Sequence, residues 1–279
     1  MRILAVNTMD RSGGAEKIAS DLVTGFGQTG HSATLAVGRS RGGIASLQIP
    51  QDRDYKPKNS IAPKPATEKI RNSEFLNGIE DFNFPGTWDL LNLESEQADL
   101  LHLHNLHGGY FDLRALPWLS KQLPTVLTLH DAWLTSGHCA HSIGCERWLT
   151  GCGECPDLNI YPSIPKDGTV FNWKRKVEIV SASNLHIVTP SKWLMDKFRA
   201  SVLWPYFLSN KVIPNGVDHS IYYTGSKHEA RDLLGLPVDS VILLSVFNVI
   251  KKRTIRFTFW NQSNFYRGFF SHFLNFLIL

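Results

Sequence analysis

Acidic residues are absent after Asp239, and charged residues make up only 19% of the sequence. The 279 residues include 29 Lys and Arg against 25 Asp and Glu, and five of the basic residues follow Asp239. The preceding part therefore holds 24 basic and 25 acidic side chains, a net charge of −1. A nucleic-acid-binding protein needs a basic face to neutralise phosphates, so this balance predicts no nucleic-acid partner.

Long apolar runs are also absent from the sequence. A membrane-spanning helix needs about 20 consecutive apolar residues, and no stretch approaches that length. The first apolar run extends only from Ile3 to Val6, which is too short for an export signal. We therefore expect a cytoplasmic protein. In that compartment, cysteines are metal ligands or free thiols more often than disulfides.

What the sequence does contain is an alternation of short apolar runs and amphipathic segments. After the run Ile3–Val6, apolar residues recur from Ala15 to Phe26 with the spacing of one helix face. We expect further helices near 66–80, 87–97, 113–119, 171–181 and 191–199, and further strands at 32–37, 99–103, 125–129, 185–188 and 211–213. Residues 39–65 read as a long surface loop. Repeated β-α units of this kind predict an α/β fold with a doubly wound parallel sheet.

The sequence predicts three regions. Residues 1–218 form the first domain, and residues 219–247 form only the beginning of a second α/β domain, with a helix near 227–234 and a strand at 241–246. Residues 257–279 contain nine of the 31 aromatic residues, without a helix or strand period. We interpret residues 248–279 as an aberrant aromatic tail of a truncated or frameshifted chain. A terminal apolar helix and a membrane-surface segment are the alternatives.

Two glycine-containing segments resemble ligand-binding loops. Gly25-Phe-Gly27-Gln-Thr-Gly30 has G-x-G-x-x-G spacing, but it ends a helix and precedes a strand, the reverse of a dinucleotide-binding loop. We interpret it as a helix C-cap and turn. Gly13 and Gly14 instead lie between the first strand and the first helix, where a helix N-terminus favours a phosphate. They are candidate binding residues, and an ordinary tight turn is the alternative.

Histidines gather around the end of the strand predicted at 99–103. His102 and His104 lie two residues apart and should face the same side of the strand. We expect His102 to be structural, and we take His104, Asn105 and His107 as candidates for ligand contact. A metal site on these histidines is the alternative.

His130 and Asp131 directly follow the strand predicted at 125–129. In an open α/β sheet, ligands bind beyond the carboxyl ends of the strands. A neutral imidazole offers one donor and one acceptor, which suits it to bind a polar ligand. Both residues are therefore candidates for the site, with a local turn cap as the alternative.

The four cysteines occur at Cys139, Cys145, Cys152 and Cys155. Four thiolates can bind zinc tetrahedrally, and the last two have the standard C-x2-C spacing. We predict a structural metal site that holds an irregular segment in place. Two disulfides and four free thiols are the alternatives.

Together, these motifs resemble the N-terminal half of a retaining glycosyltransferase of family 4, in the branch that builds exopolysaccharides such as colanic acid. The resemblance spans roughly residues 1–247 and rests on the order and spacing of short stretches: Ser12-Gly-Gly-Ala-Glu16, Leu103-His-Asn-Leu-His-Gly-Gly-Tyr110, Thr128-Leu-His-Asp-Ala-Trp133, Gly137-His-Cys139, Gly151-Cys-Gly-Glu-Cys-Pro156, Thr189-Pro-Ser-Lys-Trp193 and Ile213-Pro-Asn-Gly-Val-Asp218.

The resemblance implies the two-domain GT-B fold and transfer of a sugar from a UDP- or GDP-sugar to a saccharide or lipid-linked glycan in polysaccharide biosynthesis. It implies that Gly13 and Gly14 lie near the donor phosphates and that His130 is the catalytic-site histidine facing the donor sugar. It also implies peripheral association with the inner face of the membrane, because lipid-linked acceptors are found there. Family members are usually drawn with front-face substitution, which needs neither a protein base nor a catalytic metal.

The sequence departs from the family in its last part. The family's donor domain carries a Glu-x7-Glu motif, and no acidic residue follows Asp239. We therefore expect this chain to be incomplete and inactive alone. The alternative is a non-catalytic module that binds a saccharide or a partner. A metal-dependent hydrolase using His102, His104 and His130 is a third reading.

Overall fold

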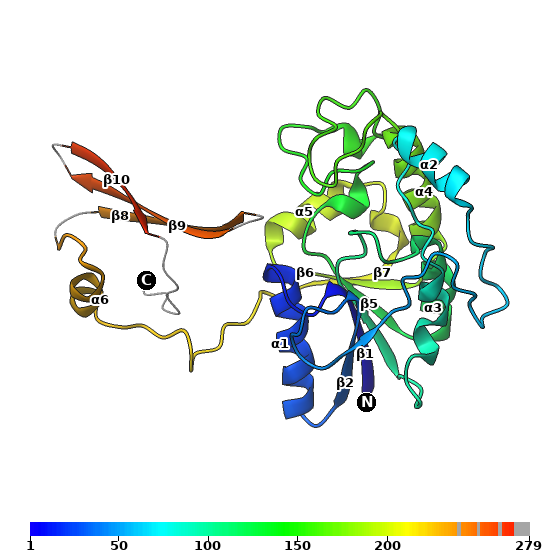
Figure 1. The fold of residues 1–279 in the computed structure, drawn as a ribbon, viewed down its shortest axis with the longest axis horizontal. Coiled ribbons are helices and arrows are strands. Elements are labelled where there is room, and N and C mark those ends of the chain that lie inside the picture. Colours follow the sequence, from blue (N-terminus) through cyan, green and yellow to red (C-terminus); the bar gives the residue numbers. More distant parts are fainter. Residues whose placement is uncertain (239–240, 250–251, 262–263, 271–279) are drawn as a thin grey trace. The chain divides into compact units, whose positions relative to one another are not determined.

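The computed structural model describes residues 1–238, 241–249, 252–261 and 264–270 (Figure 1). The chain divides into two compact units, Met1–Asn215 and Gly216–Leu279. The last part of the predicted aromatic tail, residues 271–279, lies outside the described residues.

A seven-stranded parallel sheet forms the centre of the first unit, in the order β3-β2-β1-β4-β5-β6-β7. Its strands are β1 (Arg2–Met9), β2 (Ser32–Arg39), β3 (Ser46–Gln48), β4 (Leu100–Leu103), β5 (Thr125–Thr128), β6 (Leu185–Thr189) and β7 (Phe207–Val212). The predicted α/β fold with a doubly wound parallel sheet is confirmed.

Helices connect these strands and cover the sheet. The α-helices of this unit are α1 (Gly14–Gln28), α2 (Glu68–Leu76), α3 (Leu116–Gln122), α4 (Thr169–Ser181) and α5 (Lys192–Ala200). Short 3-10 helices lie at Pro85–Asn92, Leu113–Ala115, Trp133–Thr135, Arg147–Leu149 and Trp204–Tyr206. Helix α5 begins as the sequence predicts, because Ser191 accepts a hydrogen bond from the N–H of Leu194.

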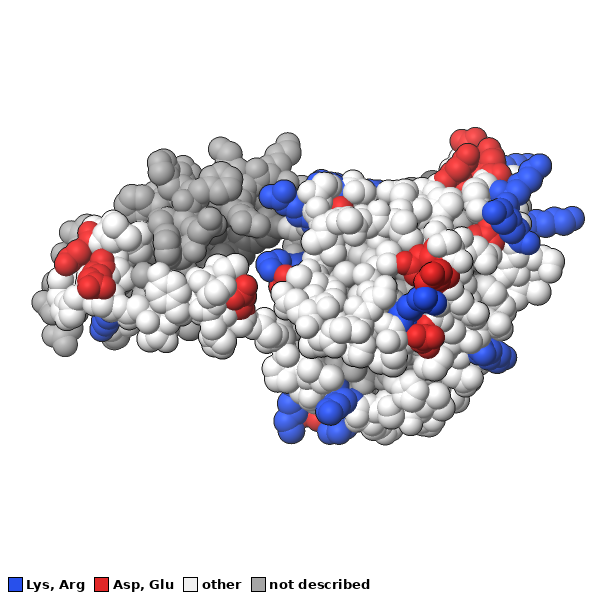
Figure 2. All heavy atoms as spheres, turned by 90° about the horizontal axis from the view of Figure 1, so that it is seen from below, with Lys and Arg blue, Asp and Glu red and all other residues white. Residues whose placement is uncertain are grey.

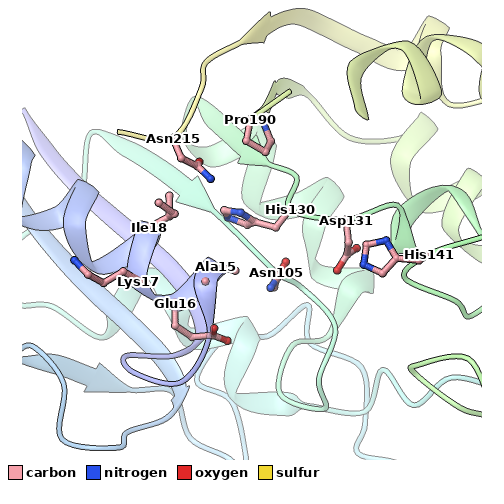
Figure 3. A pocket seen from close by; sticks show the side chains of 11 residues that line it. Ala15, Glu16, Lys17, Ile18, Asn105, His130, Asp131, His141, Pro190 and Asn215 are labelled. Carbon is pink, nitrogen blue, oxygen red and sulfur yellow. The ribbon is translucent and has the colours of Figure 1, made fainter. Parts of the chain in front are cut away.

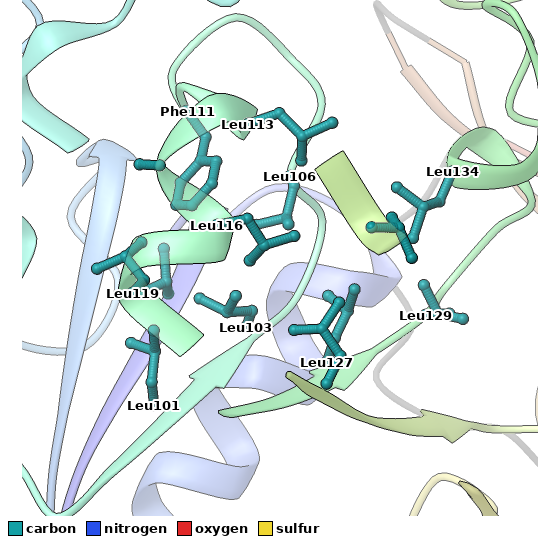
Figure 4. Packing of buried hydrophobic residues seen from close by; sticks show 14 of the residues in the cluster. Leu101, Leu103, Leu106, Phe111, Leu113, Leu116, Leu119, Leu127, Leu129 and Leu134 are labelled. Atoms are coloured by element: carbon teal, nitrogen blue, oxygen red, sulfur yellow. The ribbon is translucent and has the colours of Figure 1, made fainter. Parts of the chain in front are cut away.

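Both faces of the sheet are buried, as expected for parallel strands. In β1, Leu4 and Val6 belong to the large apolar cluster, whereas Ala5 packs on the opposite face with Ala19 and Val23 of α1. Helices α1 and α3 lie on opposite sides of the sheet (Figure 1). The large cluster joins β4 and β5 to α3 through apolar side chains that include Leu101, Leu103, Leu116, Leu119 and Leu127 (Figure 4).

The strand order reverses between β1 and β4. From β1 the chain continues outward to β2 and β3, and it then returns to place β4 on the other side of β1. Such a switch point opens a crevice at the carboxyl ends of the strands. The loops that follow β1 and β4 therefore border the natural ligand position of this fold.

Two local predictions were wrong. The region 39–65, expected to be a loop, contains the short strand β3, which pairs with β2. The helix expected near 87–97 is a 3-10 helix at Pro85–Asn92. In both cases contacts distant in sequence decide the structure: β3 depends on its neighbour strand, and Trp88 donates a hydrogen bond to the buried Asp112 at 2.9 Å.

The second unit contains α6 (Lys227–Leu234) and the antiparallel strands β8 (Val241–Val249), β9 (Lys252–Asn261) and β10 (Asn264–Phe270). Ser226 caps α6, and Gly235 ends it with a left-handed backbone. The strand predicted at 241–246 is present as β8. Its neighbour is the antiparallel β9, which residues of the predicted aromatic tail form.

The helices and the surface charge both bear on the partners of the chain. None of the helices among the described residues is long and apolar enough to cross a membrane. On the face of the first unit shown in Figure 2, charged side chains of both signs lie in small groups between uncharged areas. This pattern agrees with the nearly neutral charge of the first 239 residues.

Candidate functional site

A pocket of about 540 Å³ lies at the carboxyl edge of the parallel sheet. The segments that follow β1, β4, β5, β6 and β7 each contribute to its lining: Gly14, Ala15, Glu16, Lys17, Ile18, Asn105, His130, Asp131, His141, Pro190 and Asn215 (Figure 3). The position matches the ligand crevice expected at the strand switch point.

The N-terminus of α1 forms one wall of this pocket. Gly13 is the N-cap residue, and its N–H donates to the carboxylate of Glu16 at 2.9 Å. A Cβ atom at Gly14 would meet no atom within 4 Å beyond its chain neighbours and its own helix, so the backbone there is open to a ligand. The first N–H groups of a helix lack partners inside the helix and carry partial positive charge. This wall can therefore hold an anionic group.

The loop after β4 is fixed to the neighbouring strands. The hydroxyl of Thr8 donates to the carbonyl of His107 at 3.2 Å, and the hydroxyl of Tyr110 donates to the carbonyl of Asn105 at 2.6 Å. Gly108 takes a φ of 101°, a backbone region that favours glycine. These contacts hold Asn105 and His107 at the edge of the sheet.

His107 and Asp131 form a close pair between the loops that follow β4 and β5. Their side chains approach to 2.7 Å, and the N–H of Trp133 donates to the other carboxylate oxygen of Asp131 at 2.9 Å. Burial acts to raise the pKa of Asp131, but the hydrogen bonds from His107 and Trp133 outweigh it, so the pKa is lowered. Asp131 is therefore ionised at neutral pH, and His107 donates through Nε2.

The candidate histidines His104 and His130 form a stack with His102, and this stack ends at the pocket. The ring centroids of His102 and His104 are 4.4 Å apart, as two side chains on one strand face should be. Nε2 of His102 lies 2.8 Å from the hydroxyl of Thr128, which agrees with a structural role. Nδ1 of His104 lies 3.0 Å from Nε2 of His130. Only His130 of this stack lines the pocket.

These three imidazoles are neutral at physiological pH. Burial, followed by the nearby His130, lowers the pKa of His102 to about 4. Burial also lowers the pKa of His104 well below its ordinary value. The pKa of His130 is lowered by burial, although the carboxylates of Asp131 and Glu16 act in the opposite direction. A neutral His130 offers a ligand one donor or one acceptor rather than a charge.

The structure thus brings together every binding or catalytic candidate except Gly13, which lies immediately before the pocket wall. His104 and His107 lie directly behind the wall, in contact with His130 and Asp131. Sequence reasoning did not select the remaining lining residues: Ala15, Glu16, Lys17, Ile18, His141, Pro190 and Asn215. For Pro190 and Asn215 a signal was available, since each follows a predicted strand at its carboxyl end.

The candidate metal ligands are arranged differently. Cys139, Cys145, Cys152 and Cys155 are free and half-buried. In the part of the chain that the structure describes, no three His, Cys, Asp or Glu side chains converge as metal ligands. Cys152 instead accepts a hydrogen bond from the N–H of Gly137 at 3.2 Å. Among the described residues, neither the four cysteines nor His102, His104 and His130 are arranged to bind a metal. The zinc site therefore stays a prediction from the cysteine spacing.

Comparison with known proteins agrees with this arrangement. The profile of Glycosyltransferase Family 4 matches residues 12–221, a range that includes the whole pocket. A protein described as "Putative colanic acid biosynthesis glycosyl transferase WcaC", from Escherichia coli (strain K12), is 28% identical over 231 residues. The match covers 78% of this chain and 55% of that protein, so the chain spans about half the length of this curated relative.

The resemblance on which the sequence analysis rested is therefore confirmed. The family match extends from the glycine loop after β1 to the segment after β7, so it includes the complete parallel sheet except for β1. The chain belongs to glycosyltransferase family 4.

Proposed function

We propose that the chain provides the acceptor-side domain of a glycosyltransferase in polysaccharide biosynthesis. The reaction moves a sugar from a UDP- or GDP-sugar to a saccharide or lipid-linked glycan. The observation that carries this proposal is the pocket at the switch point of the sheet, which combines a helix N-terminus with neutral and ionised hydrogen-bonding side chains.

The wall formed by α1 suits the phosphates of the donor. Gly14 lets a ligand approach the backbone, because no side chain occupies the space in front of it. The helix N-terminus supplies N–H donors and partial positive charge. Glu16 already satisfies the N–H of Gly13, so the phosphates are expected at Gly14 and Ala15.

The opposite wall suits the hydroxyl groups of sugars. His130 faces the pocket from the end of β5 and is the residue we assign to the donor sugar (Figure 3). Asn105 and Asp131 also line the pocket, and Asp131 accepts hydrogen bonds as an ionised carboxylate. We assign Asn105 and Asp131 to hydroxyl groups of the bound sugars, while His107 orients Asp131.

We also propose that the protein acts in the cytoplasm, at the inner face of the membrane. A lipid-linked acceptor requires access to a membrane surface. Helix α2 exposes the apolar residues Ile70, Phe75 and Leu76. It carries two acidic and two basic residues, so an attachment there would depend on apolar contact and not on charge.

Saturation-transfer difference NMR with UDP-glucose, GDP-mannose and short oligosaccharides tests the proposed pocket, because the method detects weak binding. We expect Gly14→Val to reduce the signal of the nucleotide sugars at least tenfold, since the new side chain occupies the phosphate position. Gly27→Val is the matched control, because a Cβ atom at Gly27 also meets no atom within 4 Å beyond its own helix, and Gly27 lies on the same helix but outside the pocket.

Two results would count against the proposal. Equal binding by Gly14→Val and Gly27→Val would place the ligand elsewhere. Binding of oligosaccharides without any nucleotide sugar, and without turnover, would instead support the non-catalytic binding module.

A further inference from the structure

His104 is buried behind the pocket wall and contacts His130 directly. Only 1% of its surface is exposed, and its Nδ1 lies 3.0 Å from Nε2 of His130. The two rings are nearly parallel, with an interplanar angle of 20°. The pair is therefore a hydrogen bond between two imidazoles, and its direction decides which nitrogen of His130 carries the proton.

Both rings are neutral, so one of them donates and the other accepts. Burial lowers the pKa of His104 and of His130. The charged groups that face His130 are Glu16 and Asp131, and His107 lies nearby as well. A neutral imidazole has one N–H and one unprotonated nitrogen. Each ring therefore presents a single donor in this stack.

The second nitrogen of His104 decides between the two directions. Nε2 of His104 is buried, and it has no hydrogen-bond partner among the described residues. A proton on Nε2 would leave a buried N–H donor without an acceptor, a rare arrangement in folded proteins. A proton on Nδ1 instead makes the hydrogen bond to His130 and leaves only an acceptor unpaired. His104 therefore donates from Nδ1, and Nε2 of His130 accepts.

The remaining nitrogen of His130 is Nδ1, on a ring that lines the pocket. Nε2 of His130 is used by His104, so the proton of the neutral ring lies on Nδ1. The ring of His130 is half-buried and lines the pocket, and Nδ1 is not among the fully enclosed unpartnered atoms of the described residues. Figure 3 shows the ring reaching into the pocket toward Ile18 and Asn215.

We propose that His104 is a positioning residue that holds His130 in the Nδ1–H tautomer, so that His130 presents a hydrogen-bond donor to an oxygen of the bound sugar. The tautomer of His130 can be assigned without any ligand, whereas its role toward the sugar rests on the proposed function. The Nδ1–H group of His130 selects a ligand atom that accepts a hydrogen bond, such as a hydroxyl or ring oxygen of the sugar.

Nitrogen NMR of the ¹⁵N-histidine-labelled chain tests the assignment without any ligand. The protonated and unprotonated nitrogens of a neutral imidazole have clearly separated shifts. We expect His130 to show a protonated Nδ1 in the wild-type protein. A His130 protonated on Nε2 would overturn the proposal, whatever the outcome of the binding experiments.

Variants of His104 test whether this residue sets the tautomer. His104→Leu removes the donor, and we expect His130 to shift toward the Nε2–H form. His104→Asn places an amide N–H close to the position of Nδ1–H, and we expect it to restore the wild-type form. His186→Leu is the control, because His186 bonds to Ser209 outside the pocket. An unchanged His130 spectrum in a folded His104→Leu protein would contradict the proposal.

Binding then tests the consequence for the ligand. Loss of one hydrogen bond should weaken the nucleotide sugar about tenfold in His104→Leu, and His104→Asn should recover most of the affinity. Equal affinity of the wild-type and His104→Leu proteins would contradict the role assigned to Nδ1–H. If no nucleotide sugar binds to the wild-type chain, the proposed function fails, while the nitrogen spectra still decide the tautomer.

Discussion

Burial of the histidine stack couples the protonation of single residues to folding. The pKa of His102 is about 4 in the folded chain, against an ordinary value of 6.5. Between these values the unfolded chain binds more protons than the folded chain, so lowering the pH favours unfolding. The pKa of His104 is shifted in the same direction. The stability that the neutral, buried His102 contributes is fully present above pH 6.5 and is lost as the pH falls toward 4.

We expect the free energy of unfolding to decrease by roughly 3 kcal/mol between pH 7 and pH 4 from His102 alone, a value that follows from its pKa shift. Urea unfolding followed by tryptophan fluorescence across this range measures the change. His102→Gln keeps a hydrogen-bonding group near Thr128 but cannot titrate, so its stability should depend less steeply on pH. Equal slopes for the two proteins would contradict the assignment.

At the scale of elements, helix α4 holds the segment that carries the site. Lys176 of α4 is fully buried, and its ammonium donates to the carbonyls of Trp133 at 3.2 Å and Ser136 at 3.0 Å. It also forms a salt bridge of 2.9 Å with Glu80, whose carboxylate accepts from the indole N–H of Trp133 at 2.7 Å. These contacts fix the residues that directly follow His130 and Asp131.

Loss of this ammonium should destabilise the protein strongly. Lys176→Met leaves the carboxylate of Glu80 without its salt-bridge partner, and we expect a loss of about 3–5 kcal/mol in the free energy of unfolding. Lys192→Met is the matched control, because Lys192 pairs with Asp196 at 3.0 Å on the exposed face of α5 and should change little. Urea unfolding compares the two variants.

The double variant Lys176→Met with Glu80→Gln distinguishes the charge effect from lost packing. We expect it to be more stable than Lys176→Met alone, because a neutral amide costs less to bury than an unpaired carboxylate. A double variant no more stable than the single one would assign the loss to packing.

The irregular segment after β5 holds its cysteines as thiols. Burial raises the pKa of Cys152 to about 11, with a smaller opposing effect from the N–H of Gly137. Because only the thiolate is reactive, we expect alkylation of Cys152 at pH 8 to be roughly 100-fold slower than that of an unhindered free thiol. Mass spectrometry of iodoacetamide-treated protein, folded and in urea, measures the rate.

The same experiment examines the metal prediction. A purified chain that contains one zinc ion, and whose thiols become reactive only after a chelator is added, would support the site predicted from the cysteine spacing. Free thiols without bound zinc would support the arrangement that the structure describes.

At the scale of the whole molecule, the chain consists of two units that divide after Asn215. The first unit contains the complete parallel sheet and both apolar clusters. It also contains every residue that lines the pocket. The elements that build the candidate site are therefore all within a single compact unit.

We expect a fragment of residues 1–215 to fold on its own, because a compact unit with its own core is the usual condition for independent folding. Its far-ultraviolet circular dichroism should show a cooperative urea transition, with a midpoint close to that of the same unit in the 279-residue chain. A fragment without a cooperative transition would show that residues after Asn215 stabilise the sheet.

Local signals predicted the regular elements well. The apolar spacing from Ala15 to Phe26 predicted α1, and Ser191 predicted the start of α5 through its capping hydroxyl. The G-x-G-x-x-G segment was correctly interpreted as a helix end, since α1 continues to Gln28 and Gly30 has a φ of 82°. Strand β3 was missed because a three-residue segment with one apolar side chain, Leu47, shows no period, and its contacts with β2 and with the large apolar cluster are distant in sequence.

Prediction of the site was limited by a different cause. The parallel sheet implies that residues after β4 and β5 lie close together, so the proximity of His104 to His130 and of His107 to Asp131 could be anticipated. Their hydrogen-bond partners could not, because those depend on rotamers and loop paths fixed by Thr8, Tyr110 and Lys176. The same holds for the cysteines, whose spacing alone does not determine where their sulfur atoms point.

The sequence by itself therefore determined the fold class, the family and the edge of the sheet at which ligands bind. These follow from periodicity and from the order of short motifs, both of which are local properties of the chain. Only the tertiary structure decided which histidines are buried and neutral, which of them faces the pocket, and which carboxylate pairs with His107. Burial and hydrogen bonding arise from residues far apart in sequence, so these properties exist only once the strands and loops have come together.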